Sequence, residues 1–223
     1  MTVGPRQEQS WKPEGGEPSA TAPARSRRLN RWLVEGLHED LADLYAESHA
    51  TAPSDPYRGP SRQNFPNRLA TDMRRPRFAM VIAETDSLRG CAFGFPVHGD
   101  GSWWLGLDAP LPRSIEQLTV SGGVFVLADI LIRPHPQDRG LAGRLRERLL
   151  TGHQASLGAT LVAEAERQAL AALRSWGWLD SGELRRPTGP TTFRALVLPL
   201  GVRTAARLEG LVTMPGGGGP GGA

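Results

Sequence analysis

Large apolar residues gather most densely in the second half of the chain, between Val124 and Leu150. From Val124 to Ile132 they form a nearly continuous run that ends at Arg133 and Pro134, which predicts a buried strand. This run is too short to span a membrane. After a turn that contains glycine, leucines recur at every fourth position with charged residues between them, which predicts a helix with one apolar face. These leucines are Leu141, Leu145 and Leu149.

The same two periodicities predict the other elements. Leucines at helical spacing follow Asn30, a residue type that caps helix N-termini, and predict a helix to about His49. A shorter helix is expected at residues 65–73, where Pro66 lies near the start and its missing N–H does no harm. The further predicted elements are a hairpin of strands at residues 78–84 and 88–97 with a bulge or close approach at Gly90 and Gly94, a short helix at 114–118, a strand at 159–163, a helix at 167–176 and a strand at 192–200.

Helices and strands therefore mix along the chain, and their order predicts a three-layer α/β arrangement with a mixed sheet. The length allows one domain with a core large enough to be stable without disulfide bonds or bound metal, and we place it at residues 29–202. Residues 1–28 are rich in Pro, Gly, Glu and Ser, which predicts a disordered tail that lacks the apolar segment of a secretion signal. Residues 203–223 form a C-terminal extension that ends in a glycine-rich run of flexible composition.

The net charge of +3 and the sequence pI near 9.7 first invite a nucleic-acid partner. Residues 1–28 hold five basic and three acidic side chains, so most of the excess lies in the expected tail. The remaining domain is nearly balanced and shows neither aromatic-basic interleaving nor a helix-turn-helix pattern, which argues against nucleic-acid binding. Lys12 is the only lysine, and the load of Arg, Ala, Gly and Pro suggests a GC-rich bacterial coding sequence.

Cysteine and histidine usage narrows the chemistry. Cys91 is the only cysteine, which excludes an internal disulfide and a Cys-rich metal site and makes a reducing cytoplasm the simplest location. The five histidines are scattered, and none pairs with another at ligand spacing, so we expect no metal. The sequence leaves the oligomeric state open, a homodimer included.

The turn between the central strand and its helix carries the main functional signal. It places small residues at a helix N-terminus, where free amide groups and the helix dipole favour an anion such as a phosphate. Gly140 and Gly143 leave room for close approach, and Arg139 adds a planar donor fork suited to phosphate. Glycines in such turns also serve geometry alone, so both interpretations stay open. The dinucleotide pattern G-x-G-x-x-G and the P-loop pattern are both absent.

The segment Gln137 to Ala142 resembles the Gln/Arg-x-x-Gly-x-Gly/Ala loop of the GNAT acyltransferase superfamily, and the strand end Asp129 to Pro134 is similar to its acidic-apolar-x-Val-x-Pro segment. The order of elements from about Leu29 to Leu200 also resembles that family. The resemblance implies a GNAT-like three-layer fold with a central mixed, mostly antiparallel sheet flanked by helices. It further implies that the loop binds the pyrophosphate of coenzyme A, with acetyl-CoA as cosubstrate. The residues implied to bind it are Leu131, Ile132, Arg133, Gln137, Asp138, Arg139, Gly140, Leu141, Ala142, Gly143 and Arg144.

A second segment, Glu166 to Trp178, is similar to the family pattern Asn-x-x-Ala-x-x-x-Tyr-x-x-x-Gly-Phe. Glu166 stands at the Asn position and Leu173 at the Tyr position, which are departures from the pattern. That Tyr commonly protonates the departing thiolate in the family, and leucine cannot donate a proton. Because a thiol of pKa about 8.5 gives a tolerable leaving group, we expect slower turnover and not its loss.

The reaction implied by the resemblance is direct attack of an amine on a thioester carbonyl. An amine of pKa about 10 is mostly protonated at neutral pH, so a base must accept its proton. Asp129 stands where the family often places a Glu for this task, and burial would raise its pKa toward usefulness. The alternative is that Asp129 hydrogen-bonds a neighbouring backbone group or an arginine. The family also splays this strand from the next, so backbone N–H groups at residues 131–133 would hold the oxyanion.

The acceptor depends on loop surfaces that the sequence does not resolve. One surface holds Tyr57 and Arg58, and another holds Trp103 and Trp104, which form either a lid over the core or part of a pocket. The favoured function is an acyl-CoA-dependent N-acyltransferase, with acetyl-CoA and a small-molecule or peptide amine as partners and neither nucleic acid nor membrane. The alternative is a catalytically weak or inactive acyl-CoA-binding sensor module, supported by the departures at Leu173 and Glu166.

Overall fold

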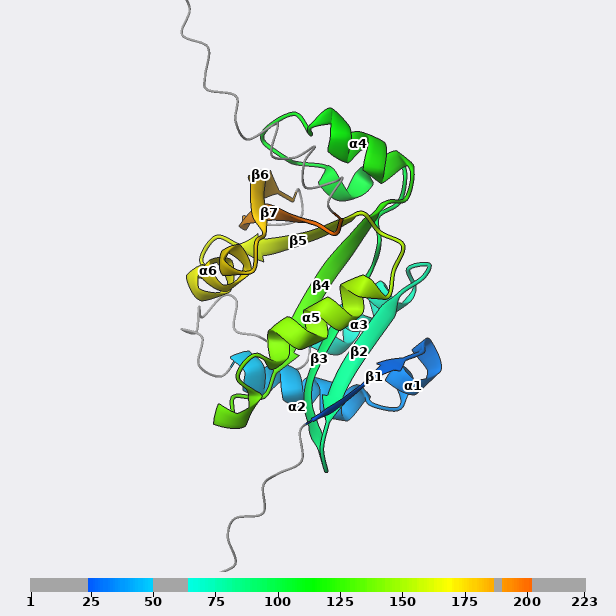
Figure 1. The fold of residues 1–223 in the computed structure, drawn as a ribbon, viewed down its shortest axis with the longest axis vertical. Helices are drawn as coiled ribbons and strands as arrows, with labels where there is room; N and C mark the ends of the chain where they lie inside the picture. Colours follow the sequence, from blue (N-terminus) through cyan, green and yellow to red (C-terminus); the bar gives the residue numbers. More distant parts are fainter. Residues whose placement is uncertain (1–23, 50–63, 187–189, 202–223) are drawn as a thin grey trace, which may run out of the picture.

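The computed structural model describes residues 24–49, 64–186 and 190–201. Within them a single sheet has the strand order β1-β2-β3-β4-β5-β7-β6 (Figure 1). All neighbouring strands are antiparallel except β4 and β5, which are parallel. The strands are β1 (Arg25–Leu29), β2 (Ala79–Glu84), β3 (Leu88–Pro96), β4 (Val124–Ile132), β5 (Leu157–Ala163), β6 (Leu179–Arg185) and β7 (Thr192–Pro199). The mixed, mostly antiparallel sheet is therefore confirmed.

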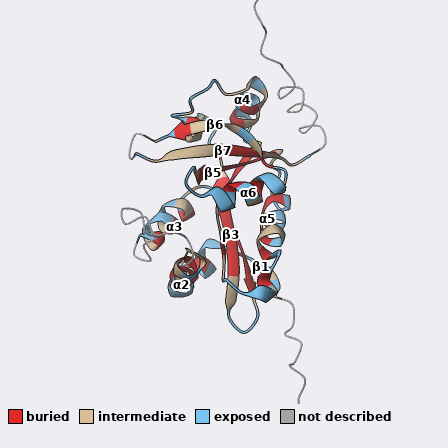
Figure 2. Ribbon diagram, turned by 90° about the vertical axis from the view of Figure 1, so that its left-hand side faces the viewer, coloured by how far each residue is buried: buried red, intermediate tan, exposed pale blue. Residues whose placement is uncertain are grey.

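Helices cover both faces of this sheet. Helices α2 and α3 lie on one face and α5 on the other (Figure 2). Helix α6 shares a buried apolar cluster with α5 and the sheet, whereas α4 closes a third cluster over β5 and β7. The helices are α1 (Arg31–Glu35), α2 (His38–His49), α3 (Phe65–Met73), α4 (Arg113–Val120), α5 (Leu141–Thr151) and α6 (Arg167–Ser175), with short 3-10 turns η1 (Ser102–Trp104) and η2 (Pro136–Asp138). The three-layer fold predicted from the order of elements is thus confirmed.

The central strand β4 and helix α5 form because their apolar residues are buried, as the apolar pattern of the sequence predicted. The first residues of β4 are buried on both sides because helices cover both faces of the sheet. Leu141, Leu145 and Leu149 face the sheet from α5 and are at most 2% exposed. Gly94 marks the close approach expected in β3, because a Cβ atom there would collide with the carbonyl oxygen of Val126 on β4.

The prediction of one long helix from Asn30 to His49 is wrong in one respect. Asn30 does cap it, since its Oδ1 accepts a hydrogen bond from the Leu33 amide at 3.0 Å. However, α1 ends at Glu35 with Gly36 as its C-cap, and α2 starts anew at His38. A glycine has the most backbone freedom to lose in a helix, so it is a favourable place for such a break.

The expected tail of residues 1–28 is corrected at its end, because β1 pairs with β2 from Arg25 onward. Its side chains are mostly arginines and only Leu29 is buried, so the strand lacks an apolar alternation that would reveal it. Arg28 instead fastens β1 to α5: its guanidinium donates to the carbonyl oxygens of Arg148, Leu149 and Gly152 at 3.1–3.4 Å. These carbonyls belong to the last turn of α5, where a cation opposes the negative end of the helix dipole.

Arg28→Ala should therefore lower the free energy of unfolding by about 1 kcal/mol, because the last carbonyls of α5 lose a charged donor. Urea denaturation at neutral pH measures this. Arg25→Ala is the matched control on the same strand, since the Arg25 side chain is exposed. Equal stability loss in the two variants would contradict the capping role.

His153 lies just beyond α5, and its ring stacks on that of Phe125 with centroids 4.0 Å apart. Its Nε2 is buried without a hydrogen-bond partner in the described part of the chain. Burial, reinforced by the charges of Arg28 and Arg77, lowers the pKa of His153 to about 4. The folded protein thus keeps this ring neutral at pH values where a free histidine is charged.

Stability should fall as the pH drops from about 6.5 toward 4, because the unfolded His153 gains a proton in that window and the folded one does not. His153→Phe preserves the stack on Phe125 and cannot be protonated. We expect urea midpoints of the variant to change less between pH 7 and pH 5 than those of the parent chain. Parallel pH dependence of the two would contradict the assignment.

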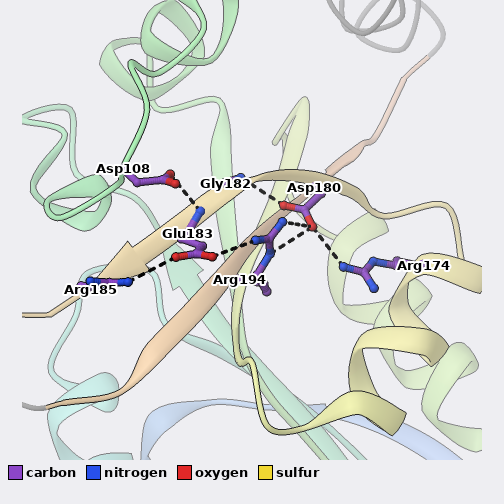
Figure 3. A network of polar contacts seen from close by, with 7 residues as sticks. All are labelled: Asp108, Arg174, Asp180, Gly182, Glu183, Arg185 and Arg194. Atoms are coloured by element: carbon purple, nitrogen blue, oxygen red, sulfur yellow. Dashed lines mark hydrogen bonds and ion pairs between the residues drawn. The ribbon is translucent and has the colours of Figure 1, made fainter.

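Strand β6 was not predicted, and no strand was expected between residues 176 and 192. Only Leu184 in it is buried, so apolar periodicity is absent. Polar pairs hold this edge strand: Asp180 accepts hydrogen bonds from Arg174 and Arg194, and Glu183 accepts one from Arg194 at 3.4 Å (Figure 3). The strand is stabilised by neighbours on α6 and β7 that a local pattern does not show.

Trp104 supports the lid interpretation of the tryptophan pair. It is 6% exposed and packs in the cluster beneath α4, with its Nε1 donating to Thr119 Oγ1 at 3.0 Å. Trp103 packs against the same cluster from the partly buried side. The two tryptophans cover the apolar cluster that lies between α4 and strands β5 and β7.

Candidate functional site

The site is built where β4 and β5 separate. The two strands pair only at their first residues, from Val124 opposite Leu157 to Val126 opposite Ala159. Beyond this point β4 pairs only with β3, and β5 continues along β7 to Ala163. One edge of β4 thus loses its neighbouring strand over its last residues, as the resemblance implied.

A bulge in β4 decides which side chains face which layer. The β3 register shifts so that Phe93 lies opposite Asp129 and Gly94 opposite Leu127, which leaves Ala128 as the extra residue. Leu127, before the bulge, packs toward α5, whereas Leu131, after it, packs in the cluster of α2 and α3. The bulge therefore brings Asp129 to the face covered by α2 and α3.

Asp129 is the predicted base, and its carboxylate is held on both oxygens. Its Oδ1 accepts a hydrogen bond from the Ile130 amide at 2.9 Å, and its Oδ2 accepts one from Arg68 on α3 at 2.5 Å. These are the contacts of the alternative considered above, a backbone group and an arginine. Burial raises the pKa of Asp129 while Arg68 and His49 oppose that rise. The Asp129 side chain is 19% exposed, so it is not sealed from solvent.

Aromatic rings support Arg68 in this position. Tyr45 and Phe65 stack with ring centroids 4.5 Å apart, and the Arg68 guanidinium carbon lies 5.2 Å and 5.7 Å from the two centroids. Burial raises the pKa of Tyr45, and its hydroxyl is also influenced by the charges of Arg68, Asp129 and Glu166. A phenol from α2 thus stands among the charged groups at the opening of the two strands.

Arg68 and the polar role of Tyr45 were not predicted from the sequence. Helical spacing assigned Tyr45 to the apolar side of its helix, where its ring does pack. Arg68 gave no local signal, because its partner lies 61 residues away. Tyr57 and Arg58, expected on the acceptor side, lie outside the described residues.

The amides predicted to hold the oxyanion, those of Leu131 and Ile132 on β4 and of Arg133 just after it, point in different directions. The Arg133 amide donates to the Arg89 carbonyl oxygen on β3 at 2.9 Å, so its expected role toward an oxyanion is corrected. In an antiparallel pair the amides alternate between the two sides, which turns Leu131 toward β3 as well. By the same alternation, Ile130 and Ile132 present amides to the edge that β5 leaves. Asp129 already accepts from the Ile130 amide, so Ile132 provides the donor available there.

The predicted anion loop forms a glycine-capped helix start. Gly140 precedes α5 with a φ of 77°, a left-handed conformation that favours glycine, and no side chain caps the helix there. A Cβ atom on Gly143 would meet nothing within 4 Å, so space is open above the first turn. Arg139 and Arg144 are exposed on either side of Gly140. The first amides of α5 and two guanidinium groups therefore surround an open surface suited to a diphosphate.

Asp138 has a different role from the one expected of a ligand-binding residue. Its Oδ2 accepts a hydrogen bond from Arg89 at 2.6 Å, and its side chain is 7% exposed. The pair ties the loop to β3 and neutralises an acid that would otherwise repel a phosphate. Leu141 points into the core, so it offers only its backbone, and the side chain of Gln137 lies outside the described residues.

The second family-like segment forms α6 and the turn after it, and it packs in the cluster that also holds Phe125 and Leu127 of β4. Leu173, at the usual Tyr position, is 7% exposed and belongs to the core cluster. Trp178 is 2% exposed in the same cluster, as an aromatic at the Phe position would be. No hydroxyl is therefore available from residue 173.

A hollow of about 570 Å³ lies on the flank of α6 that faces β6 and β7. Two of its guanidinium groups, those of Arg174 and Arg194, are paired with Asp180. None of its lining residues is among those predicted to bind the coenzyme, so it is separate from the anion loop. Its lining residues are Glu164, Ala165, Arg167, Leu170, Arg174 and Arg194.

Two further findings concern the described residues alone. No group of three or more His, Cys, Asp or Glu side chains in them is arranged to hold a metal ion. No helix among them is long and apolar enough to cross a lipid bilayer.

Comparison with solved structures gives matches over most of the chain. An acetyltransferase from Thermus thermophilus matches with a TM-score of 0.53 and 17% identity, covering 81% of this chain and 99% of that one. The ribosomal-protein-S18-alanine N-acetyltransferase from Escherichia coli matches with a TM-score of 0.51 and 14% identity over 80% and 96% of the two chains. The Salmonella typhimurium protein yncA, solved with its cofactor acetyl-CoA, matches with a TM-score of 0.50 and 12% identity over 80% and 94%.

The chain has the GNAT fold. No protein-family model matches the sequence, and no curated protein matches it either. At identities this low the likeness of the GNAT structures concerns the arrangement of the backbone, and the chemistry depends on the residues described above.

Proposed function

We propose that this GNAT-fold protein is an acyl-CoA-dependent N-acyltransferase that transfers an acetyl group from acetyl-CoA to an amine. The observation that carries the proposal is the open first turn of α5 beside the separated edge of β4. The amides from Gly140 to Gly143, with Arg139 and Arg144, would bind the diphosphate. The acyl end would then extend along β4 toward Asp129, and the matches with acetyltransferases support acetyl transfer as the reaction.

Each part of the site has a task in this reaction. The thioester supplies an activated carbonyl carbon. Asp129 accepts a proton from the acceptor ammonium, directly or through water, and leaves a neutral amine nitrogen. This nitrogen forms the C–N bond as the C–S bond breaks, and the Ile132 amide donates to the carbonyl oxygen while it carries negative charge. The products are an amide and a coenzyme thiolate, which takes up the second proton lost by the nitrogen.

The acid that protonates the thiolate is not at residue 173, where this chain has leucine. Tyr45 is a phenol on the opposite layer whose surroundings include Asp129 and Glu166. If an acid is required, we would expect the Tyr45 hydroxyl to give its proton to the thiolate and to take up the second proton lost by the nitrogen. A thiolate leaving group also permits turnover with water as the acid, at a lower rate.

The second candidate is an acyl-CoA-binding module without catalysis. The specific observation in its favour is that both Asp129 oxygens are engaged by protein donors and residue 173 offers no acid. This module would bind the coenzyme at the same loop and would show no turnover.

Release of free thiol separates the two candidates. The full chain is mixed with acetyl-CoA and a broad panel of amines, and the thiol is followed by a colorimetric reagent, while calorimetry measures coenzyme A binding separately. Saturable thiol release with at least one amine supports the enzyme. Tight binding without release from any amine supports the binding module, and an absence of binding at millimolar coenzyme A removes both.

A further inference from the structure

Arg68 occupies the position on Asp129 that an acceptor ammonium would need. One N–H of its guanidinium donates to Oδ2 of Asp129 at 2.5 Å, and the other oxygen is held by the backbone. The Arg68 side chain is 51% exposed, so a substrate can reach its guanidinium from solvent. A substrate that approaches Asp129 must therefore compete with a cation supplied by the protein.

Two further carboxylates on α2 and α3 are also paired with arginines. Asp72, one turn after Arg68 on α3, lies 3.6 Å from Nε of Arg75, and Glu47 on α2 lies 2.6 Å from Nε of Arg133. Together with Asp129 and Arg68 they make three acid–arginine pairs among the described residues on this side of the sheet. A purely cationic amine would find no unpaired carboxylate among these acids, and binding at Asp129 would leave Arg68 beside a second positive charge.

A zwitterionic amine avoids this conflict, because it brings one charge of each sign. Its ammonium replaces the guanidinium on Asp129, and its carboxylate becomes the new partner of Arg68. An α-amino acid carries the two groups on one carbon, which matches the short separation of Asp129 and Arg68. The planar guanidinium can then donate two parallel hydrogen bonds to the carboxylate, a stronger arrangement than its single bond to Asp129.

We propose that the acceptor is a free α-amino acid whose carboxylate is bound by Arg68 while its amino group is presented to Asp129. This inference rests on the proposed N-acyltransferase function and assigns its substrate class. The stacked rings of Tyr45 and Phe65 hold Arg68 at the mouth of the site, where it selects carboxylates. Arg68 is thus a specificity-determining residue, and Asp129 receives the proton.

The test uses matched acceptors that differ only in the carboxylate. Each common L-amino acid is compared with its amide and with its decarboxylated amine, using acetyl-CoA as donor and free thiol as readout. Binding of the same compounds to the protein saturated with coenzyme A is measured by calorimetry. We expect the best amino acid to exceed its amide and its amine at least tenfold in kcat/KM and in affinity.

Arg68→Gln should remove this preference. The amino acid is expected to lose at least tenfold in kcat/KM, while the amine and amide stay unchanged or improve because Asp129 is no longer occupied. Arg68→Lys keeps the charge without the planar fork and should give an intermediate preference. Arg174→Gln is the control, because Arg174 forms a comparable half-exposed ion pair in the β6 network and should leave the preference intact.

The outcomes separate this inference from the proposed function. Equal or better use of compounds without a carboxylate by the parent chain overturns the inference and leaves the enzyme in place. An equal loss for acids, amides and amines in Arg68→Gln assigns Arg68 a structural role and also overturns it. Absence of thiol release from every acceptor overturns the enzyme, and in that case calorimetry still decides whether Arg68 binds an amino-acid carboxylate.

Discussion

Gly143→Asp is expected to weaken coenzyme A binding about 100-fold, a free-energy change of roughly 2.8 kcal/mol, with little effect on the folded protein. Gly143 lies in the first turn of α5, and a side chain added there enters open space. A carboxylate at this position interacts favourably with the positive end of the helix dipole, so it does not destabilise the helix. It would, however, take the place of the diphosphate and repel it. Calorimetry with coenzyme A measures the effect, and the melting temperature verifies that the fold is kept.

Gly143→Asn is the matched control, since asparagine has nearly the same shape without the charge. We expect it to lose much less affinity than the aspartate variant. Gly140 is a less suitable position, because its φ of 77° would strain any other residue whatever its charge. Unchanged affinity in Gly143→Asp would show that the diphosphate does not bind at this helix.

The parts of the fold that the sequence predicted are those with a strong local pattern. The apolar run of β4, the leucine stripe of α5 and the glycines between them each follow from residues within a few positions of one another. The same holds for the hairpin of β2 and β3 and for Pro66 at the start of α3. In each case burial on a helix face or a covered sheet sets the periodicity.

The missed elements are held by distant partners. β1 is fastened by Arg28 to the end of α5, and β6 is fastened by Asp180 and Glu183 to neighbouring arginines. Both are edge strands with a single buried side chain, so an apolar alternation is not required of them. The local sequence pattern of such a charged edge strand resembles that of a loop.

The candidate site was predicted in its backbone and missed in its side-chain pairing. The bared loop amides follow from a short motif, whereas the separation of β4 was implied by the family resemblance. The direction of Asp129 depends on the bulge at Ala128, which appears only in the register with β3. Its partner Arg68 comes from another layer, and the pair of Asp138 and Arg89 likewise joins residues 49 positions apart. Patterns along a single sequence do not reveal contacts between residues so far apart.

Asp129→Asn should lower kcat about 100-fold at neutral pH, the lower end of the range for loss of a general base. Asparagine keeps the size of the side chain and an oxygen that can accept from the Ile130 amide or Arg68, but it cannot take a proton from an amine. Steady-state thiol release measures kcat. Calorimetry serves as control, because coenzyme A binding at the α5 loop should be unchanged. A loss of coenzyme affinity equal to the loss in kcat would point to a distorted strand and away from proton transfer.

The pH dependence of rate and stability gives this variant a signature of its own. Burial raises the pKa of Asp129 above that of an ordinary carboxyl, so the acid limb of kcat should lie at a higher pH than an ordinary carboxyl would give in the parent and vanish in Asp129→Asn. A raised folded pKa means that the folded state binds more protons between the two pKa values, so Asp129 stabilises at low pH and this contribution is lost as the pH rises. Asparagine does not ionise. The melting temperature of the variant should therefore gain on that of the parent from acid to neutral pH while its activity falls, whereas a side chain needed only for structure would lose both.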